Sequence, residues 1–131
     1  MIQALDIAAT DSTPSIKFDG AKNFFEIRGE SRPENAQKFY TPVFGWIDQY
    51  IADLSSAKPS NKIIFKFYLE YFNSTSSKFL MSLISKIDKI KLLDINVEVQ
   101  WEYDYQDIDM KEMGIEFSNL VSVPFSFIPV Q

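Results

Sequence analysis

The chain has 131 residues, a length that suits one domain with one hydrophobic core, and we predict a single domain over residues 1–131. Its 13 basic and 18 acidic residues give a net charge of -5, which opposes binding to the phosphate backbone of nucleic acids. It contains no cysteine and no histidine, which excludes disulfides, thiolate nucleophiles, imidazole bases and zinc sites with nitrogen or sulfur ligands.

The first predicted elements are two short strands joined by a tight turn. Residues 16–18 and 24–28 are rich in apolar side chains, and Asp19 and Gly20 follow the first strand. An Asp-Gly pair reverses the chain at low energetic cost, so we predict a hairpin. The segment before Pro14 has weaker periodicity and is expected to form an edge strand or an arm.

A long helix is predicted next. Ser31 is a candidate cap, and Pro33 and Glu34 are typical of a first helical turn. Apolar side chains then keep helical spacing at Ala36, Phe39, Tyr40, Val43, Phe44, Ile47, Tyr50, Ile51 and Leu54. Pro42 removes one backbone donor inside this run, so we expect it to kink the helix or split it.

The strongest predicted strand is KIIFKFYLEYF, residues 62–72, whose β-branched and aromatic side chains on both faces favour a central position in a sheet. NSTSS, residues 73–77, supplies capping side chains for a second helix. The apolar stripe of that helix comprises Phe79, Leu80, Leu83, Ile84 and Ile87. The order strand, helix, strand, helix predicts parallel pairing of the strands.

The last third of the chain predicts two more strands and a third helix. Residues 95–103 alternate between apolar and polar side chains, which is typical of a strand with one buried face. We expect a helix that is interrupted or ended near Gly114 and that turns four side chains towards the core, namely Ile108, Met113, Phe117 and Leu120. Residues 123–130 hold two prolines and predict a short closing strand at a sheet edge. The fold class is therefore α/β.

The acidic residues before and within this third helix are a candidate metal site that the sequence does not support. The cluster comprises Asp104, Asp107, Asp109, Glu112 and Glu116. It lacks the glycine at position six and the glutamate at position twelve of a calcium loop. We interpret it as a solvated helix start, where acids are favoured by the helix dipole. With no paired-carboxylate or imidazole site, the sequence predicts no catalytic residue, no metal and no cofactor, and a protein that is not an enzyme.

The segment YFNSTSSK, residues 71–78, places four consecutive hydroxyl side chains between a central strand and a helix. A helix start offers unpaired N–H groups and a partial positive charge, so a phosphate attached there is stabilised. The alternative interpretation is that Asn73, Ser74 and Thr75 only compete to cap the helix. A cap needs one such residue, whereas this segment has several.

No run approaches the roughly 18 apolar residues of a membrane span. The first residues also lack the basic start and the long apolar stretch of a secretory signal. We therefore expect a cytoplasmic protein without membrane insertion.

Several segments together resemble the SiaC family of bacterial regulatory phosphoproteins. They are STPSIKFD (12–19), IRGESRPEN (27–35), the Trp46 region, LEYFNSTSSK (69–78), VQWEYD (99–104) and DMKEMGIEF (109–117). The resemblance implies a STAS-like fold of the anti-sigma factor antagonist type, a mixed β-sheet of about four to six strands covered by about three helices. It also implies a partner kinase, a metal-dependent serine/threonine phosphatase, and a diguanylate cyclase that the unmodified form binds and activates. Cyclic di-GMP would then control aggregation and biofilm formation.

The resemblance further implies which residues carry the switch. The family pattern has threonine directly after the asparagine, where this chain has Ser74 followed by Thr75, so a gap-free match selects Ser74 and leaves Thr75 as the alternative. The predicted partner-binding residues are Asn73, Ser76, Ser77, Lys78, Pro33, Glu34 and Asn35. A second hypothesis is a constitutive, non-enzymatic scaffold or assembly protein of the same fold, in which NSTSS is only a cap. The sequence does not decide the oligomeric state.

Overall fold

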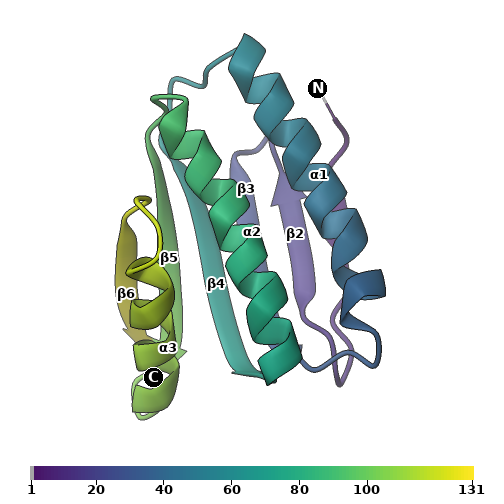
Figure 1. The fold of residues 1–131 in the computed structure, drawn as a ribbon, viewed down its shortest axis with the longest axis vertical. Coiled ribbons are helices and arrows are strands. Elements are labelled where there is room, and N and C mark those ends of the chain that lie inside the picture. Colours follow the sequence, from purple (N-terminus) through teal and green to yellow (C-terminus); the bar gives the residue numbers. More distant parts are fainter. Residues whose placement is uncertain (1) are drawn as a thin grey trace.

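Residues 2–131, which the computed structural model describes, form one mixed sheet and three helices (Figure 1). The strands are β1 Leu5–Ile7, β2 Ser15–Asp19, β3 Phe24–Ser31, β4 Ile63–Phe72, β5 Val97–Asp104 and β6 Phe125–Val130. The helices are α1 Ala36–Ser56, α2 Ser74–Leu92 and α3 Ile108–Ser118. The predicted α/β class, with a mixed sheet of four to six strands and about three helices, is confirmed.

The strands lie in the sheet in the order of the chain, β1-β2-β3-β4-β5-β6. The pairs β1–β2 and β2–β3 are antiparallel, which confirms the predicted hairpin and places the leading segment at the sheet edge. The pairs β3–β4, β4–β5 and β5–β6 are parallel. As a result, the carboxyl ends of these strands share one edge of the sheet, where α1 and α2 also begin (Figure 1).

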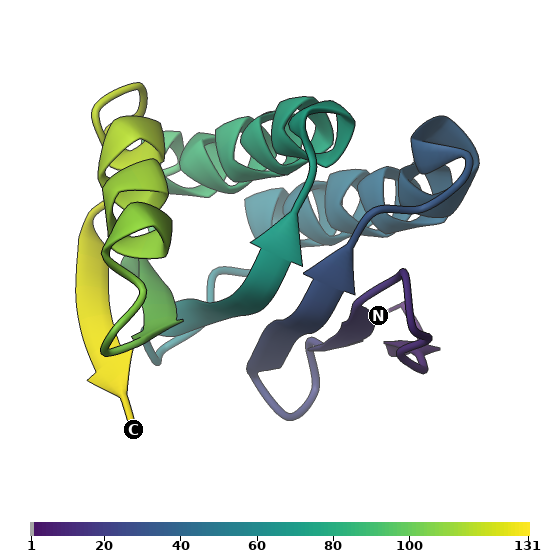
Figure 2. The same ribbon diagram turned by 90° about the horizontal axis from the view of Figure 1, so that it is seen from below.

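All three helices cover the same face of the sheet (Figure 2). The side chains of that face are fully buried at Phe65 and Phe67 of β4 and at Val99 and Trp101 of β5. The other face carries partly exposed side chains such as Lys66, which aligns with Gln100 of β5. The predicted central position of β4 is confirmed, although its second face is not covered by a helix.

The predicted start of the first helix is wrong. Ser31 is the last residue of β3 and is fully buried, so it does not cap a helix. The cap is Asn35, whose side-chain oxygen accepts a hydrogen bond from the Lys38 N–H at 3.1 Å. Residues 32–34 connect the sheet to the helix layer, and the helix begins after this connection.

The predicted split of the helix at Pro42, one of the two expected outcomes, is absent, because α1 is continuous from Ala36 to Ser56. Tyr40 and Val43, on either side of the proline, are fully buried and hold both parts of the helix on the sheet. Pro42 itself is exposed, and the Thr41 hydroxyl donates to the Gln37 carbonyl at 2.6 Å. Packing on the sheet therefore outweighs the loss of one backbone hydrogen bond.

The third helix differs from the expectation in both its length and its buried face. It runs through Gly114 without interruption, and its buried residues are Met110, Gly114 and Phe117. Ile108, Met113 and Leu120 are instead exposed, at 55%, 39% and 69%. Gly114 is required by packing, since a Cβ there would lie 2.5 Å from the Trp101 ring. The glycine thus lets α3 rest directly on an aromatic side chain of β5.

Candidate functional site at the start of helix α2

The start of α2 is held by Asn73, which links it to two strands. Its side-chain oxygen accepts from the Ser76 N–H at 2.8 Å, and its carbonyl accepts from the Ser77 N–H at 3.0 Å. Its own N–H donates to the Ser31 carbonyl at 3.1 Å. The first turn of α2 is therefore fixed to the carboxyl ends of both β3 and β4, and Asn73 acts as the cap.

The four hydroxyl side chains after Asn73 have different surroundings. Ser74 and Thr75 are exposed, and Ser77 is partly buried. Ser76 is fully buried, which contradicts its predicted place on the partner-binding surface. The reason is helical geometry, since one position in this turn must face the sheet. Ser74 and Thr75 thus remain as the accessible hydroxyls at the start of the helix, and Lys78 is exposed one turn further on.

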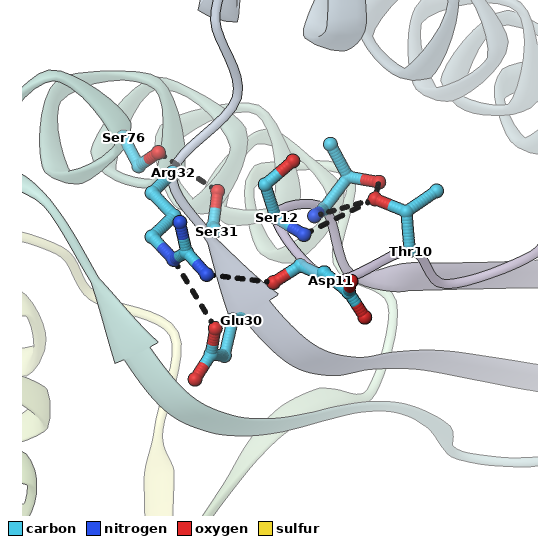
Figure 3. Close-up of polar contacts among 8 residues, drawn as sticks. Thr10, Asp11, Ser12, Glu30, Ser31, Arg32 and Ser76 are labelled. Carbon is cyan, nitrogen blue, oxygen red and sulfur yellow. Dashed lines mark hydrogen bonds and ion pairs between the residues drawn. The ribbon is translucent and has the colours of Figure 1, made fainter.

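Ser76 belongs to a buried chain of hydroxyl groups that joins β3, α1 and α2. The Ser31 hydroxyl donates to Ser76 Oγ at 2.8 Å (Figure 3) and lies 2.6 Å from the Tyr40 hydroxyl. Burial raises the pKa of Tyr40 to about 12, and its hydrogen bond with Ser31 only partly offsets that effect. The phenol therefore stays protonated and donates a hydrogen bond to the Ser31 hydroxyl. The Ser31 hydroxyl in turn donates its own hydrogen bond to Ser76.

A β-bulge explains why Ser31 and Phe72 both face the helix layer. The pairing of β3 with β4 shifts between Gly29 and Glu30, so that Ser31 aligns with Phe72. Gly29 has a φ of 122°, a backbone conformation that favours glycine. On β4 the shift leaves Tyr71 exposed at 49%, directly before the capped helix start. Bulges of this kind redirect side chains beside functional sites.

The segment that follows β3 is held by Arg32. Its guanidinium group pairs with the Glu30 carboxylate at 3.2 Å and donates to the Asp11 carbonyl at 3.1 Å (Figure 3). Pro33 is partly buried, while Glu34 and Asn35 are exposed. Because α1 and α2 begin at the same edge of the sheet, the three residues lie at the same end of the molecule as Ser74 (Figure 1).

A shallow depression of about 260 Å³ lies between the start of α2 and helix α3. It is lined by Phe72, Asn73, Ser74, Ser77, Met113, Glu116 and Phe117. Ser74 lines this depression and Thr75 does not. The contribution of α3 was not predicted from the sequence. The available signal was the spacing of Met110, Gly114 and Phe117, which turns Met113 and Glu116 away from the sheet.

Within residues 2–131, no group of three or more acidic side chains is arranged to hold a metal ion. Asp107 caps α3 by accepting from the Met110 N–H at 3.1 Å, as expected for a helix start. In the same part of the chain, none of the helices has the length and apolarity needed to span a membrane.

The start of α2 offers exposed hydroxyls at a positively polarised helix end, which is a setting for phosphorylation and recognition.

These features define a two-layer α/β protein with a hydroxyl-bearing helix start at the carboxyl edge of its sheet. Residues 7–130 match the family model described as SiaC family regulatory phosphoprotein, so the chain belongs to the SiaC family. The predicted resemblance is confirmed over nearly the whole chain. The family description is that of a regulatory phosphoprotein, which confirms the expectation of a regulatory, non-enzymatic role.

Known proteins from Pseudomonas aeruginosa are similar to this chain in sequence, and the solved ones also in fold. An uncharacterized protein of strain UCBPP-PA14 is 28% identical over 122 residues, which are 93% of each chain. The crystal structure of apo-SiaC is 25% identical and superposes with a TM-score of 0.85, over 97% of this chain and 99% of that one. SiaC in complex with diguanylate cyclase SiaD, described as the activator of SiaD, gives a TM-score of 0.84 at 25% identity, over 96% and 99%.

Proposed function

We propose that this protein binds and activates a diguanylate cyclase when it is unphosphorylated, and releases it when the start of α2 is phosphorylated. The first half of the proposal is supported by the similar chain that was crystallised with SiaD as its activator. The second half is supported by the family description and by the exposed hydroxyls after the Asn73 cap. A partner kinase and a metal-dependent phosphatase in the cytoplasm would set the fraction of this protein that is phosphorylated.

Ser74 is the proposed main acceptor, and Thr75 is the alternative. Both side chains are accessible to a kinase, but only Ser74 lines the depression that faces α3. A phosphate on Ser74 would gain from the partial positive charge of the helix start. That gain needs no rearrangement of the sheet, because Asn73 already fixes the first turn.

The surface around Ser74 suggests why a phosphate would release the partner. The exposed apolar side chain of Met113 lines the depression, and Glu116 adds a negative charge to its wall. A partner that covers this surface would remove water from Ser74. A phosphate adds about -1.5 to -2 charges, which such a partner would bury beside the carboxylate of Glu116. Asn73, Ser77, Lys78 and the segment Pro33–Asn35 complete the proposed partner surface.

Phosphosite mapping by mass spectrometry tests the acceptor directly. After reaction with the cognate kinase, we expect phosphate on Ser74 in the wild type and loss of most of it in Ser74→Ala. Thr75→Ala is the matched control and should still be phosphorylated at Ser74. Undiminished phosphate in both single variants and in the double variant would rule out the proposed switch site and leave the constitutive scaffold as the better hypothesis.

A further inference from the structure

A larger pocket of about 540 Å³ lies at the opposite end of the sheet from Ser74. Three segments form its walls, namely the β2–β3 turn, the last two turns of α1 and the loop that leads to β4. The side chain of Asn23 in the turn donates to the Lys62 carbonyl at 2.9 Å, so two of the walls are tied together. The volume is in the range that suits a small organic ligand.

One carboxylate oxygen of Asp53, a residue that lines this pocket, lacks a hydrogen-bond donor. This atom, Oδ2, is buried without any hydrogen-bond partner among the described residues. Oδ1 has only a long bond of 3.3 Å from Gln49, and Asp53 is in none of the ion pairs found in residues 2–131. The residue also lies in the last turn of α1, where the helix dipole adds negative potential. A carboxylate in this position favours a cationic donor.

The rest of the pocket is mainly apolar. Tyr50 is 7% exposed and lies against Trp46 and Phe25, with ring centroids 5.1 and 5.2 Å apart. Burial raises the pKa of Tyr50 to about 12, so its phenol stays neutral and the negative charge in the wall belongs to Asp53. Leu54, Ala57 and Pro59 continue the apolar surface. Asn23, Ser56, Ser60 and Asn61 also line the pocket, but Asp53 is the single carboxylate among the lining residues, which is a poor ligand set for an inorganic cation.

We propose that this pocket binds a small organic cation, in which a primary ammonium group pairs with Asp53 and an apolar body lies against Tyr50 and Leu54. An anionic ligand is opposed by the same carboxylate. A neutral ligand of the same shape would fill the apolar part but leave the charge of Asp53 unpaired. The proposal does not depend on phosphorylation of Ser74 or on the cyclase.

The test compares three probes that share a phenyl ring on a short chain, 2-phenylethylamine, 2-phenylethanol and 3-phenylpropanoate, by NMR titration of the full chain. We expect the amine to cause saturable shifts confined to the backbone amides of residues 20–23 and 53–61. The alcohol and the carboxylate should bind on the order of ten-fold more weakly, or not at all. Equal binding of the amine and the alcohol, or no saturable shift with any probe, would overturn the proposal.

Two variants make the test specific for the carboxylate. Asp53→Asn keeps the size of the side chain and should reduce the affinity for the amine to that for the alcohol, as should Asp53→Ala. Asp48→Asn is the matched control, because Asp48 is exposed on the same helix and pairs instead with Lys86. Retained amine binding in both folded Asp53 variants would contradict the assignment, as would a loss of binding in Asp48→Asn.

Discussion

At the scale of single residues, the start of α2 separates two roles that the sequence places side by side. Ser74 is exposed, whereas Ser76 is fully buried and bonded to Ser31. A run of hydroxyl residues thus contains both a surface group that a kinase can reach and an internal group that holds the helix. A cap requires only one such side chain, and among the additional hydroxyls that of Ser76 has a structural role.

Replacing Ser31 tests the internal role. Ser31→Ala removes the acceptor of the Tyr40 hydroxyl and the donor to Ser76, and both partners are fully buried. Leaving buried hydroxyls unpaired costs about 1–3 kcal/mol, so the free energy of unfolding in urea should fall by that amount. The exposed control Thr75→Ala should change it by less than about 0.5 kcal/mol. Equal stability of the two variants would refute the role of the buried network.

Glu98 predicts a pH dependence of stability on the uncovered face of the sheet. A hydrogen bond from Lys62 at 2.5 Å lowers the pKa of Glu98, burial raises it, and a hydrogen bond from Ser126 lowers it. Because the folded pKa is below the unfolded value near 4.5, the contribution to stability is fully present above pH 4.5. It is lost as the pH falls through the folded pKa.

The measurement is the difference in unfolding free energy between wild type and Glu98→Gln as a function of pH. We expect the wild type to lose its pH-dependent advantage over the variant as the pH falls below 4.5. Glu112→Gln, at an exposed position of α3, is the control for removing one negative charge from the chain. A difference that grows on acidification would show that the sign is wrong.

At the scale of elements, the sequence predicts whether a segment is a helix or a strand better than it predicts where that element begins and ends. Alternation from Ile63 to Leu69 and helical spacing from Phe79 to Ile87 identify β4 and α2, because each pattern matches one buried face. The start of α1 and the continuity of α1 and α3 were predicted wrongly. In each case the deciding contact is tertiary: Ser31 bonds to α2, Tyr40 and Val43 hold α1 together, and Gly114 packs on Trp101.

The candidate site was likewise predicted only in part. Its hydroxyl segment is local in sequence, and the fold places Ser74 and Thr75 at the surface as a helix start requires. The contributions of Met113 and Glu116 come from a helix more than thirty residues away, whose buried face was misassigned. The side of α3 that faces the site depends on the fit of Gly114 against Trp101, and helical periodicity alone does not specify that fit.

The two helical glycines give a matched prediction. Gly114→Ala would place a Cβ 2.5 Å from the Trp101 ring, so we expect a loss of about 1–3 kcal/mol of stability by overpacking. Gly45→Ala in α1 meets nothing within 4 Å and should stabilise the helix by up to about 1 kcal/mol. Thermal unfolding of the two variants should therefore shift in opposite directions. Shifts of the same sign would show that backbone propensity, and not contact with Trp101, controls position 114.

At the scale of the whole molecule, the two ends of the sheet carry different chemistry. The carboxyl edge of the parallel strands gathers the starts of α1 and α2, with their partial positive charge (Figure 1). The opposite end holds the end of α1 and the pocket around Asp53. The hydroxyl switch proposed for Ser74 therefore lies where the fold itself favours a phosphate.

The decisive prediction for the proposed switch concerns partner binding and stability together. Ser74→Asp should weaken binding to the cognate cyclase, because it adds a second negative charge beside Glu116 that the partner must bury. The loss is expected at about 2–5 kcal/mol, which corresponds to tens to thousands of fold in affinity. Ser74→Ala should bind like the unphosphorylated wild type and resist release by the kinase. Since Ser74 is exposed at the first position of α2, the melting temperature should change little in either variant.

Calorimetry with the purified cyclase, combined with thermal unfolding, measures both quantities. Ser82→Asp supplies the control, since Ser82 is exposed on the same helix two turns beyond Ser74 and makes the same change of charge away from the depression. It should bind the cyclase as tightly as the wild type does. Equal affinity of wild type, Ser74→Asp and the phosphorylated protein would favour a constitutive scaffold, while equal weakening by Ser82→Asp would mean that net charge, and not the site at the start of α2, controls the interaction.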